Sequence, residues 1–193
     1  MDPETSHLTR ELFARRTVLL FGEIGPALAE RVTAQLLALD AASADPIRLF
    51  VCSPGGHVES GDTIFDVIRF VRAEVTAIGS GWVASAGALV FCACARERRV
   101  ALPNTRFLLH EPRGGVGGSA SDIEVEAGQL LAMRARLHRI FAEATGRSVE
   151  QIAHDTRRDH WMTAEEAVAY GLVGRVVGRE SDLSDRREAP QSG

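Results

Sequence analysis

A serine, a histidine and an aspartate in this 193-residue sequence are of the types that together perform nucleophilic catalysis. Ser85 lies in the glycine- and alanine-rich stretch 79–88, His110 follows an apolar run, and Asp159 lies well downstream of both. A serine hydroxyl is a poor nucleophile at neutral pH, so it needs a base such as an imidazole to accept its proton. That base needs a carboxylate to fix its tautomer and to stabilise the imidazolium. These residue types therefore predict nucleophilic catalysis by a Ser–His–Asp triad.

The order of the three residues along the chain limits the class of enzyme. Chymotrypsin has the order His, Asp, Ser; subtilisin has Asp, His, Ser; and the α/β-hydrolases have Ser, Asp, His. The order Ser85, His110, Asp159 matches none of these three classes. We therefore expect a different fold that has reached the same chemistry.

Each of the three residues also has a structural interpretation. Ser85 could be a helix N-cap, and His110 could be a hydrogen-bonded core histidine. Glu111 is an alternative third member of the triad, but adjacent strand residues point to opposite faces, so Asp159 is the better candidate. The presence of a complete set favours catalysis over the separate structural roles.

Small residues surround Ser85, and they allow a substrate backbone to approach it. A helix that begins here offers backbone N–H groups without intrahelical partners to a developing oxyanion. The N–H of Ala86 is therefore an expected oxyanion donor. A metal site at His154, Asp155, Asp159 and His160 is the competing interpretation of the polar residues, but their spacing matches no compact ligand motif.

The composition predicts one globular domain rather than a nucleic-acid or membrane protein. Hydrophobic residues make up 45% of the chain, and the net charge is −4 with a pI near 5.9, which disfavours binding to nucleic acid or acidic lipid. Clustered arginines at 96, 98 and 99 are expected in a solvated turn. The three cysteines lie in apolar runs, which suggests a reducing compartment. Without a signal peptide or an apolar span, a cytoplasmic location is expected.

Apolar periodicity predicts alternating strands and helices, and hence a mainly parallel sheet. Strands are expected at 17–21, 47–52, 75–78, 99–102, 106–109 and 172–177. Helices are expected at 26–42, 60–72, 83–95, 121–145, after a Ser148 cap, and after a Thr163 cap. The long helix should begin at a capping box of Ser121 and Glu124.

The domain boundaries follow from where periodicity starts and stops. Residues 1–9 are polar and are expected to be mobile. The single domain covers 10–178, and the polar residues 179–193 are expected to form a disordered tail.

Four ordered motifs make the chain similar to the proteolytic subunit of the Clp protease (ClpP). They are a Ser-Pro-Gly-Gly run at 53–56, Ala-Ser-Ala-Gly at 84–87, His-x-Pro at 110–112, and Arg-Asp followed by Met-x-Ala-x-Glu-Ala and Tyr-Gly-Leu within 158–172. The similarity extends from about residue 10 to residue 177, and the separations between the motifs fit the family without insertion or deletion.

The resemblance implies a fold, an activity and an assembly. The fold is a crotonase-like (ClpP) α/β domain of repeated β-β-α units with a protruding long handle helix. The activity is that of an ATP-dependent-type serine endopeptidase that needs no cofactor or metal for hydrolysis of unfolded proteins and peptides. The assembly is a heptameric ring, two of them stacked, served by a Clp-type AAA+ unfoldase. Nucleic acid and membrane are not expected partners.

The resemblance also implies roles for further residues. Gly56 would be the second oxyanion donor, while Val58 and Arg113 would mark the edges that pair with an extended substrate. The chain departs from the family where Ala86 replaces a common methionine, Glu111 replaces glutamine, and His57 and Arg113 replace apolar residues. The family's N-terminal pore hairpin has no counterpart in residues 1–9, so a less guarded axial entrance is expected.

Two other functions remain open from the sequence. A non-catalytic ring subunit would scaffold an active paralogue, but the intact triad argues against it. An acyl-CoA hydratase or isomerase shares the crotonase fold and the oxyanion hole, but it carries acids rather than this triad at the reacting centre.

Overall fold

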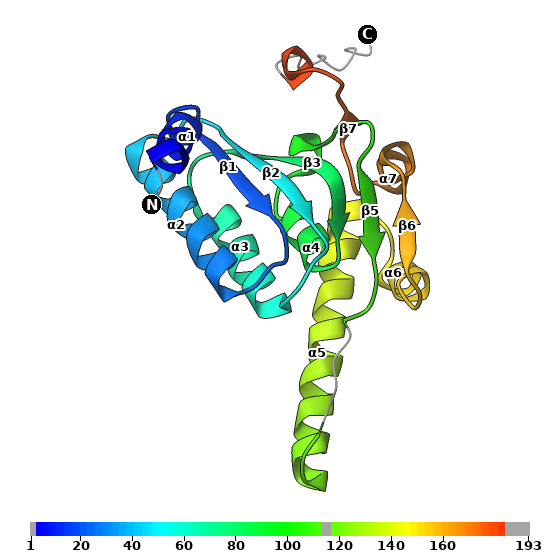
Figure 1. Ribbon diagram of the computed structural model, residues 1–193. Coiled ribbons are helices and arrows are strands. Elements are labelled where there is room, and N and C mark those ends of the chain that lie inside the picture. The colour runs from blue at the N-terminus through cyan, green and yellow to red at the C-terminus, as the bar shows by residue number, and fades with distance from the viewer. Residues whose placement is uncertain (1–2, 113–116, 184–193) are drawn as a thin grey trace.

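The computed structural model describes residues 3–112 and 117–183, and within them the chain forms one α/β domain (Figure 1). The strands are β1 (Thr17–Phe21), β2 (Ile47–Ser53), β3 (Val75–Ala84), β4 (Arg99–Ala101), β5 (Arg106–Leu109), β6 (His160–Met162) and β7 (Arg175–Val176). The helices are α1 (Pro3–Ala14), α2 (Pro26–Ala42), α3 (Val58–Phe70), α4 (Ala86–Phe91), α5 (Ala120–Thr145), α6 (Val149–Asp155) and α7 (Ala164–Tyr170).

The sheet is mainly parallel, as the alternation of elements predicts. Its path runs β1-β2-β3-β4-β7, and β5 and β6 lie off this path. Strand β3 joins the two parts, because its first half pairs with β4 and its second half, Trp82–Ala84, pairs with β5. Strand β5 then pairs antiparallel with β6. The ten-residue strand β3 is thus the branch point of the seven-stranded sheet.

The core lies between the sheet and the helices that pack on it. In β2, alternate residues Ile47, Leu49 and Val51 are fully buried, because successive strand residues point to opposite faces. Helix α2 begins at Pro26, a residue suited to the first helical position. Helix α4 is buried along its whole length. In α2, Leu39 is buried and Leu37 is exposed.

Helix α5 protrudes from the domain as the long rod in Figure 1. Its buried residues all lie at its C-terminal end, and it closes at Gly146 in the left-handed conformation. The capping box is formed by Ser119 and Asp122, not by the predicted Ser121 and Glu124. Both pairs have the required spacing, so the sequence alone did not distinguish them. We call α5 the handle.

Among the described residues, no helix is both long and apolar enough to cross a membrane.

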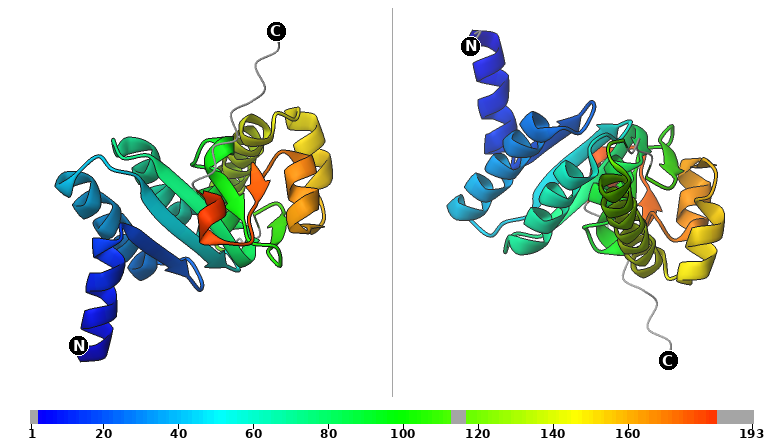
Figure 2. Two further views of the ribbon diagram at one scale, coloured as in Figure 1. Left: turned by 90° about the horizontal axis from the view of Figure 1, so that it is seen from above. Right: turned by 90° about the horizontal axis from the view of Figure 1, so that it is seen from below.

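The two ends of the chain differ from the expectation of mobile segments. Residues 3–14 form α1, which projects from the rest of the domain in both views of Figure 2. Pro3 is compatible with this because proline suits the first turn of a helix. After β7, Glu180–Leu183 form a short 3₁₀ turn, and Glu180 pairs with Arg48. The rest of the expected tail lies outside the described residues.

Arg99 is buried, although the sequence indicated a solvated turn for the arginines at 96–99. Its side chain is among the largest fully buried ones, at 2% exposure. The Arg99 guanidinium donates from Nη2 to the Ala144 carbonyl at 2.6 Å. Ala144 lies in the last turn of α5, where carbonyls lack intrahelical donors and carry partial negative charge. Arg99 therefore anchors the handle to β4.

We predict that Arg99→Ala lowers the free energy of unfolding by about 3 kcal/mol, because it leaves a cavity and an unpaired carbonyl. Arg98→Ala is the matched control, since Arg98 makes only a surface ion pair with Glu74 and should cost less than about 1 kcal/mol. Chemical denaturation of both variants measures the difference. Equal losses would show that Arg99 is not a structural anchor.

Candidate active site

Ser85 occupies a strained turn between β3 and α4. Its φ of 54° and ψ of −121° lie in a region that a serine rarely adopts. The Ser85 N–H donates to the Leu108 carbonyl of β5 at 3.0 Å, which holds the turn against the neighbouring strand. Strain of this kind persists where the surrounding structure enforces it, and it commonly marks a functional residue.

The local secondary structure around Ser85 differs from the predicted helix at 83–95. Strand β3 continues to Ala84, and the helix begins only at Ala86. An apolar run does not distinguish a buried strand from a buried helix, and here pairing with β5 extends the strand. Ser85 therefore lies at the N-cap position rather than in the first helical turn.

The glycine loop after β2 packs directly against Ser85. A Cβ added to Gly55 would lie 2.5 Å from the Ser85 Cβ and 3.0 Å from its Oγ, so only glycine allows this approach. Gly55 and Gly56 also have φ values of 103° and 140°, which other residues rarely adopt. A Cβ on Gly56 would collide with the Ile24 carbonyl.

The backbone N–H groups of Gly56 and Ala86 belong to the two segments that adjoin Ser85, the glycine loop and the start of α4. Ile24 fixes the peptides on either side of Gly56, because its N–H donates to Gly55 and its carbonyl accepts from His57, both at 2.8 Å. The N–H of Gly56 takes part in neither bond. On the other side, Ala86 is the first residue of α4, so its N–H has no intrahelical acceptor. Such a pair of N–H groups is suited to binding an oxyanion.

His110 and Asp159 face each other next to this turn. His110 follows β5, and its Nδ1 lies 3.3 Å from Oδ1 of Asp159. With Nδ1 turned to the carboxylate, Nε2 is the nitrogen left to accept a proton. The structure records no hydrogen bond between the described side chains of Ser85 and His110, but both line one pocket. A serine and an imidazole–carboxylate pair are therefore brought together from segments far apart in the sequence.

Strand register accounts for this convergence. Ala84, just before Ser85, pairs with Leu108 in β5, and Leu109 pairs with His160 in β6. His110 follows Leu109 directly, and Asp159 precedes His160. Two registers thus place all three residues at neighbouring strand ends.

The pocket beside Ser85 is small and mainly apolar, with about 10 Å³ of free space. Val58, the first residue of α3, lines it, while Arg113 lies outside the described residues. The complete lining consists of Val58, Ser85, Ala86, Leu89, His110, Pro112, Leu137 and Phe141. The free space of this pocket is about that of a single water molecule.

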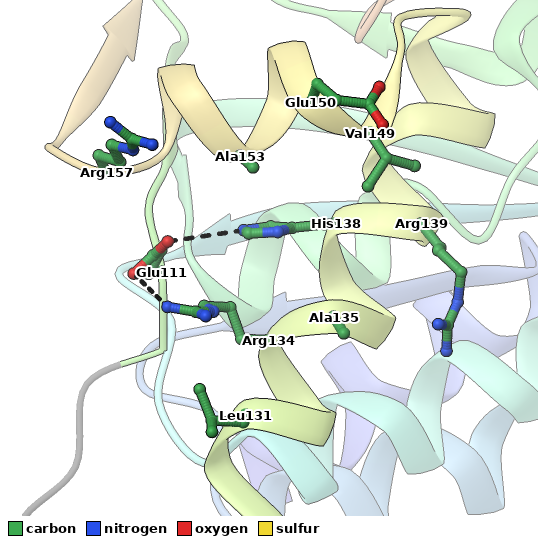
Figure 3. Close-up of a pocket in the computed structure, with 10 residues that line it drawn as sticks. All are labelled: Glu111, Leu131, Arg134, Ala135, His138, Arg139, Val149, Glu150, Ala153 and Arg157. Atoms are coloured by element: carbon green, nitrogen blue, oxygen red, sulfur yellow. Dashed lines mark ion pairs between the residues drawn. The ribbon is translucent and has the colours of Figure 1, made fainter.

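Glu111, which follows the end of β5, is turned toward α5 and away from the proposed base. Its carboxylate faces Arg134 at 3.7 Å and His138 at 3.9 Å, both on α5 (Figure 3). Asp159 is therefore the carboxylate positioned to orient His110. Sequence reasoning did not identify His138, because a single histidine on a helix carries no sequence signal for a partner 27 positions earlier.

The cysteines and the His154–Asp155 region are weaker candidates for a reactive or metal-binding site. Burial raises the pKa of the Cys92 thiol to about 11 and that of Cys94 to about 12, so both are protonated at neutral pH and are poor nucleophiles. Within residues 3–112 and 117–183, no group of three or more His, Cys, Asp or Glu side chains is arranged to hold a metal ion. His154 instead contacts Asp155, whose other oxygen accepts from Tyr170.

Comparison with known proteins gives consistent results. The family model described as Clp protease matches residues 2–180. The chain is 60% identical over 166 residues to the "ATP-dependent Clp protease proteolytic subunit 3" of Rhizobium meliloti, covering 86% of this chain and 85% of that protein. It is 56% identical over 185 residues to "ATP-dependent Clp protease proteolytic subunit 2" of Gluconobacter oxydans, covering 95% and 83%.

A solved structure agrees with the predicted fold. The chain superposes on a point mutant of ClpP1 from Listeria monocytogenes with a TM-score of 0.86 and 47% sequence identity, covering 92% of this chain and 99% of that one. The expected ClpP-type α/β fold is thus confirmed.

We predict that Gly55→Ala reduces peptide hydrolysis at least about 100-fold, because the added methyl group displaces Ser85 by clashing with its Cβ. Gly22→Ala is the matched control: its φ is also positive, at 94°, but nothing lies within 4 Å of an added Cβ. It should cost only the backbone strain of about 1–2 kcal/mol in stability. Equal activity in the two variants would contradict a close Gly55–Ser85 contact.

Proposed function

Because this chain belongs to the Clp protease family and is a serine peptidase of that type, we propose that Ser85, His110 and Asp159 are its catalytic triad. The observation that carries this assignment is the convergence of the three side chains. The strained Ser85 turn lies next to an imidazole whose Nδ1 faces the Asp159 carboxylate.

In this mechanism, Ser85 Oγ attacks the peptide carbonyl while Nε2 of His110 takes the hydroxyl proton. Asp159 holds the Nδ1–H and stabilises the imidazolium. The N–H groups of Gly56 and Ala86 bind the oxyanion of the tetrahedral intermediate. His110 then gives its proton to the leaving amine, and an acyl-enzyme forms on Ser85. Water activated by His110 hydrolyses the ester and restores the free serine.

The substrate is an extended segment of an unfolded protein or peptide. Val58 and Arg113 mark the chain segments that flank the scissile bond and pair with the substrate backbone. Backbone pairing gives little dependence on sequence. The side chains around Ser85 are largely apolar, Leu89, Leu137 and Phe141 among them, and this favours an apolar substrate residue next to the cleaved bond. Ala86, smaller than the methionine of many relatives, leaves more room at its mouth.

The working enzyme is a ring assembly fed by an ATPase. Relatives are named proteolytic subunits of an ATP-dependent protease, which fits a heptameric ring, two rings stacked, and a Clp-type AAA+ unfoldase. In the monomer, the handle exposes Val125 at 64% and Leu131 at 54%, and α3 exposes Phe70 at 79%. Apolar side chains exposed to this extent are suited to burial between subunits or against a partner.

The alternative functions predict different behaviour. An acyl-CoA hydratase or isomerase would act without a serine nucleophile, and a scaffolding subunit would show no hydrolysis of its own. Kinetics of triad variants on a fluorogenic peptide separate the three.

We expect Ser85→Ala and His110→Ala each to lower kcat about 10⁴- to 10⁶-fold, and Asp159→Asn about 10⁴-fold, because triad members act as a unit. His154→Ala removes an exposed histidine outside the site and serves as the control. Melting temperatures of all variants should stay near that of the wild type. Near-normal turnover by Asp159→Asn would refute the assignment of Asp159.

We also expect sedimentation analysis to give a mass that is a multiple of seven times the 20.8 kDa monomer. Val125→Asp should shift the protein to smaller, less active species, because it places a charge on the exposed apolar part of the handle. Glu124→Gln, on the same turn, should leave the assembly unchanged. A monomeric protein with full activity would rule out the ring.

A further inference from the structure

A buried histidine lies at the base of the handle, next to the segment that carries the proposed base. His138 is 7% exposed, and its Nε2 lies 3.2 Å from Thr156 Oγ1 and 3.9 Å from Glu111 Oε1. Figure 3 shows the His138 ring and the Glu111 carboxylate pointing toward one another across a pocket of about 510 Å³. The triad mechanism uses none of these three side chains.

The hydrogen bonds fix the role of each atom in this cluster. Thr156 Oγ1 has a single proton, and it donates to the Ile152 carbonyl at 2.7 Å. Thr156 Oγ1 must therefore accept from His138, which requires the proton of the imidazole to be on Nε2. Glu111 Oε1, at 3.9 Å from the same nitrogen, is beyond hydrogen-bond distance and acts on the imidazole through its charge. His138 is thus a donor to Thr156 and lies next to the Glu111 carboxylate, on two other segments of the chain.

Those two segments carry the catalytic groups. Glu111 directly follows His110, and its backbone N–H donates to the Thr156 carbonyl at 3.1 Å. Thr156 in turn lies three residues before Asp159. The cluster therefore ties the chain that bears the base to the chain that bears the acid, and it ties both to α5. The His110–Asp159 distance depends on how these segments are held.

We propose that His138 is a positioning residue: its Nε2–H, donated to Thr156 Oγ1, holds the Thr156–Asp159 segment against the base of the handle, and the backbone bond between Glu111 and Thr156 extends this hold to the segment of His110. This inference rests on the proposed triad. The rate of catalysis falls steeply when reacting groups shift by about 1 Å. Loss of this donor should therefore lower kcat while KM changes little.

The charges around His138 favour its neutral form. Burial lowers its pKa below the usual 6.5, the Glu111 carboxylate opposes this, and Arg134 reinforces it. The other charged groups that line the pocket are Arg139 from α5, Glu150 from α6 and Arg157 after α6. A protonated His138 would be drawn toward Glu111 and repelled by Arg134, which would disturb the segment that follows His110.

The lowered pKa of His138 also fixes the direction in which folding stability changes with pH. The unfolded chain binds this proton at a higher pH than the folded chain does, so the stability from neutral His138 is complete above pH 6.5. That stability is lost progressively as the pH falls through 6.5 toward the folded pKa. A residue that does not titrate at position 138 removes this part of the pH dependence.

Two substitutions separate donation from packing. His138→Phe keeps a ring of similar shape without a donor, whereas His138→Asn keeps an N–H donor in a smaller side chain that does not titrate. We expect His138→Phe to lower kcat for a fluorogenic peptide about 10- to 100-fold with KM near the wild-type value. His138→Asn should retain most of kcat at about pH 7.5, and should lose less activity and melting temperature than the wild type between about pH 7.5 and pH 5.5.

His154→Phe is the matched control, because it makes the same change at a histidine whose side chain is 75% exposed. A His138→Phe variant with wild-type kcat, or a His138→Asn variant as impaired as His138→Phe, would overturn the inference. If His138→Phe does not fold, the kcat and pH profile of His138→Asn decide the question alone. Ser85→Ala, assayed in parallel, tests the proposed triad separately from the role of His138. Activity in that variant would refute the triad itself.

Discussion

The active site depends on the register of three short strand segments. Pairing of β3 with β5 sets Ser85 beside the end of β5, and pairing of β5 with β6 sets Asp159 beside His110. The side-chain period of a strand is two residues, so a slip of one residue would turn the following side chain to the opposite face. A slip in either pair would therefore separate Ser85, His110 and Asp159, although the fold could survive it.

The glycine loop imposes the second constraint. Ser85 keeps a strained backbone because Gly55 packs against its side chain and because Leu108 accepts its N–H. The same loop holds Gly56 through two bonds with Ile24. One short loop thus positions both the proposed nucleophile and the proposed oxyanion donor Gly56, and the strain at Ser85 is sustained by the surrounding sheet.

The sequence predicted the α/β class and the long helix, because each has a local pattern, and its motifs named the three residues of the proposed triad. It did not predict β6, because a strand of three residues is too short to show a periodic pattern. It also did not predict α1, because the polar composition of that segment suggested a mobile end of the chain. It placed Arg99 at the surface and overlooked His138, because burial of a charged or polar side chain is decided by distant segments. Tertiary contacts set these features, and the local pattern does not contain them.

The central claim is that Ser85 is an activated nucleophile, and covalent labelling tests it most directly. A fluorophosphonate reacts with a serine whose proton is taken by a neighbouring base and whose oxyanion is bound. Peptide mapping by mass spectrometry after labelling should find a single adduct on Ser85, absent from His110→Ala. An adduct on a different serine, or peptide hydrolysis that continues with Ser85 unlabelled, would contradict this account.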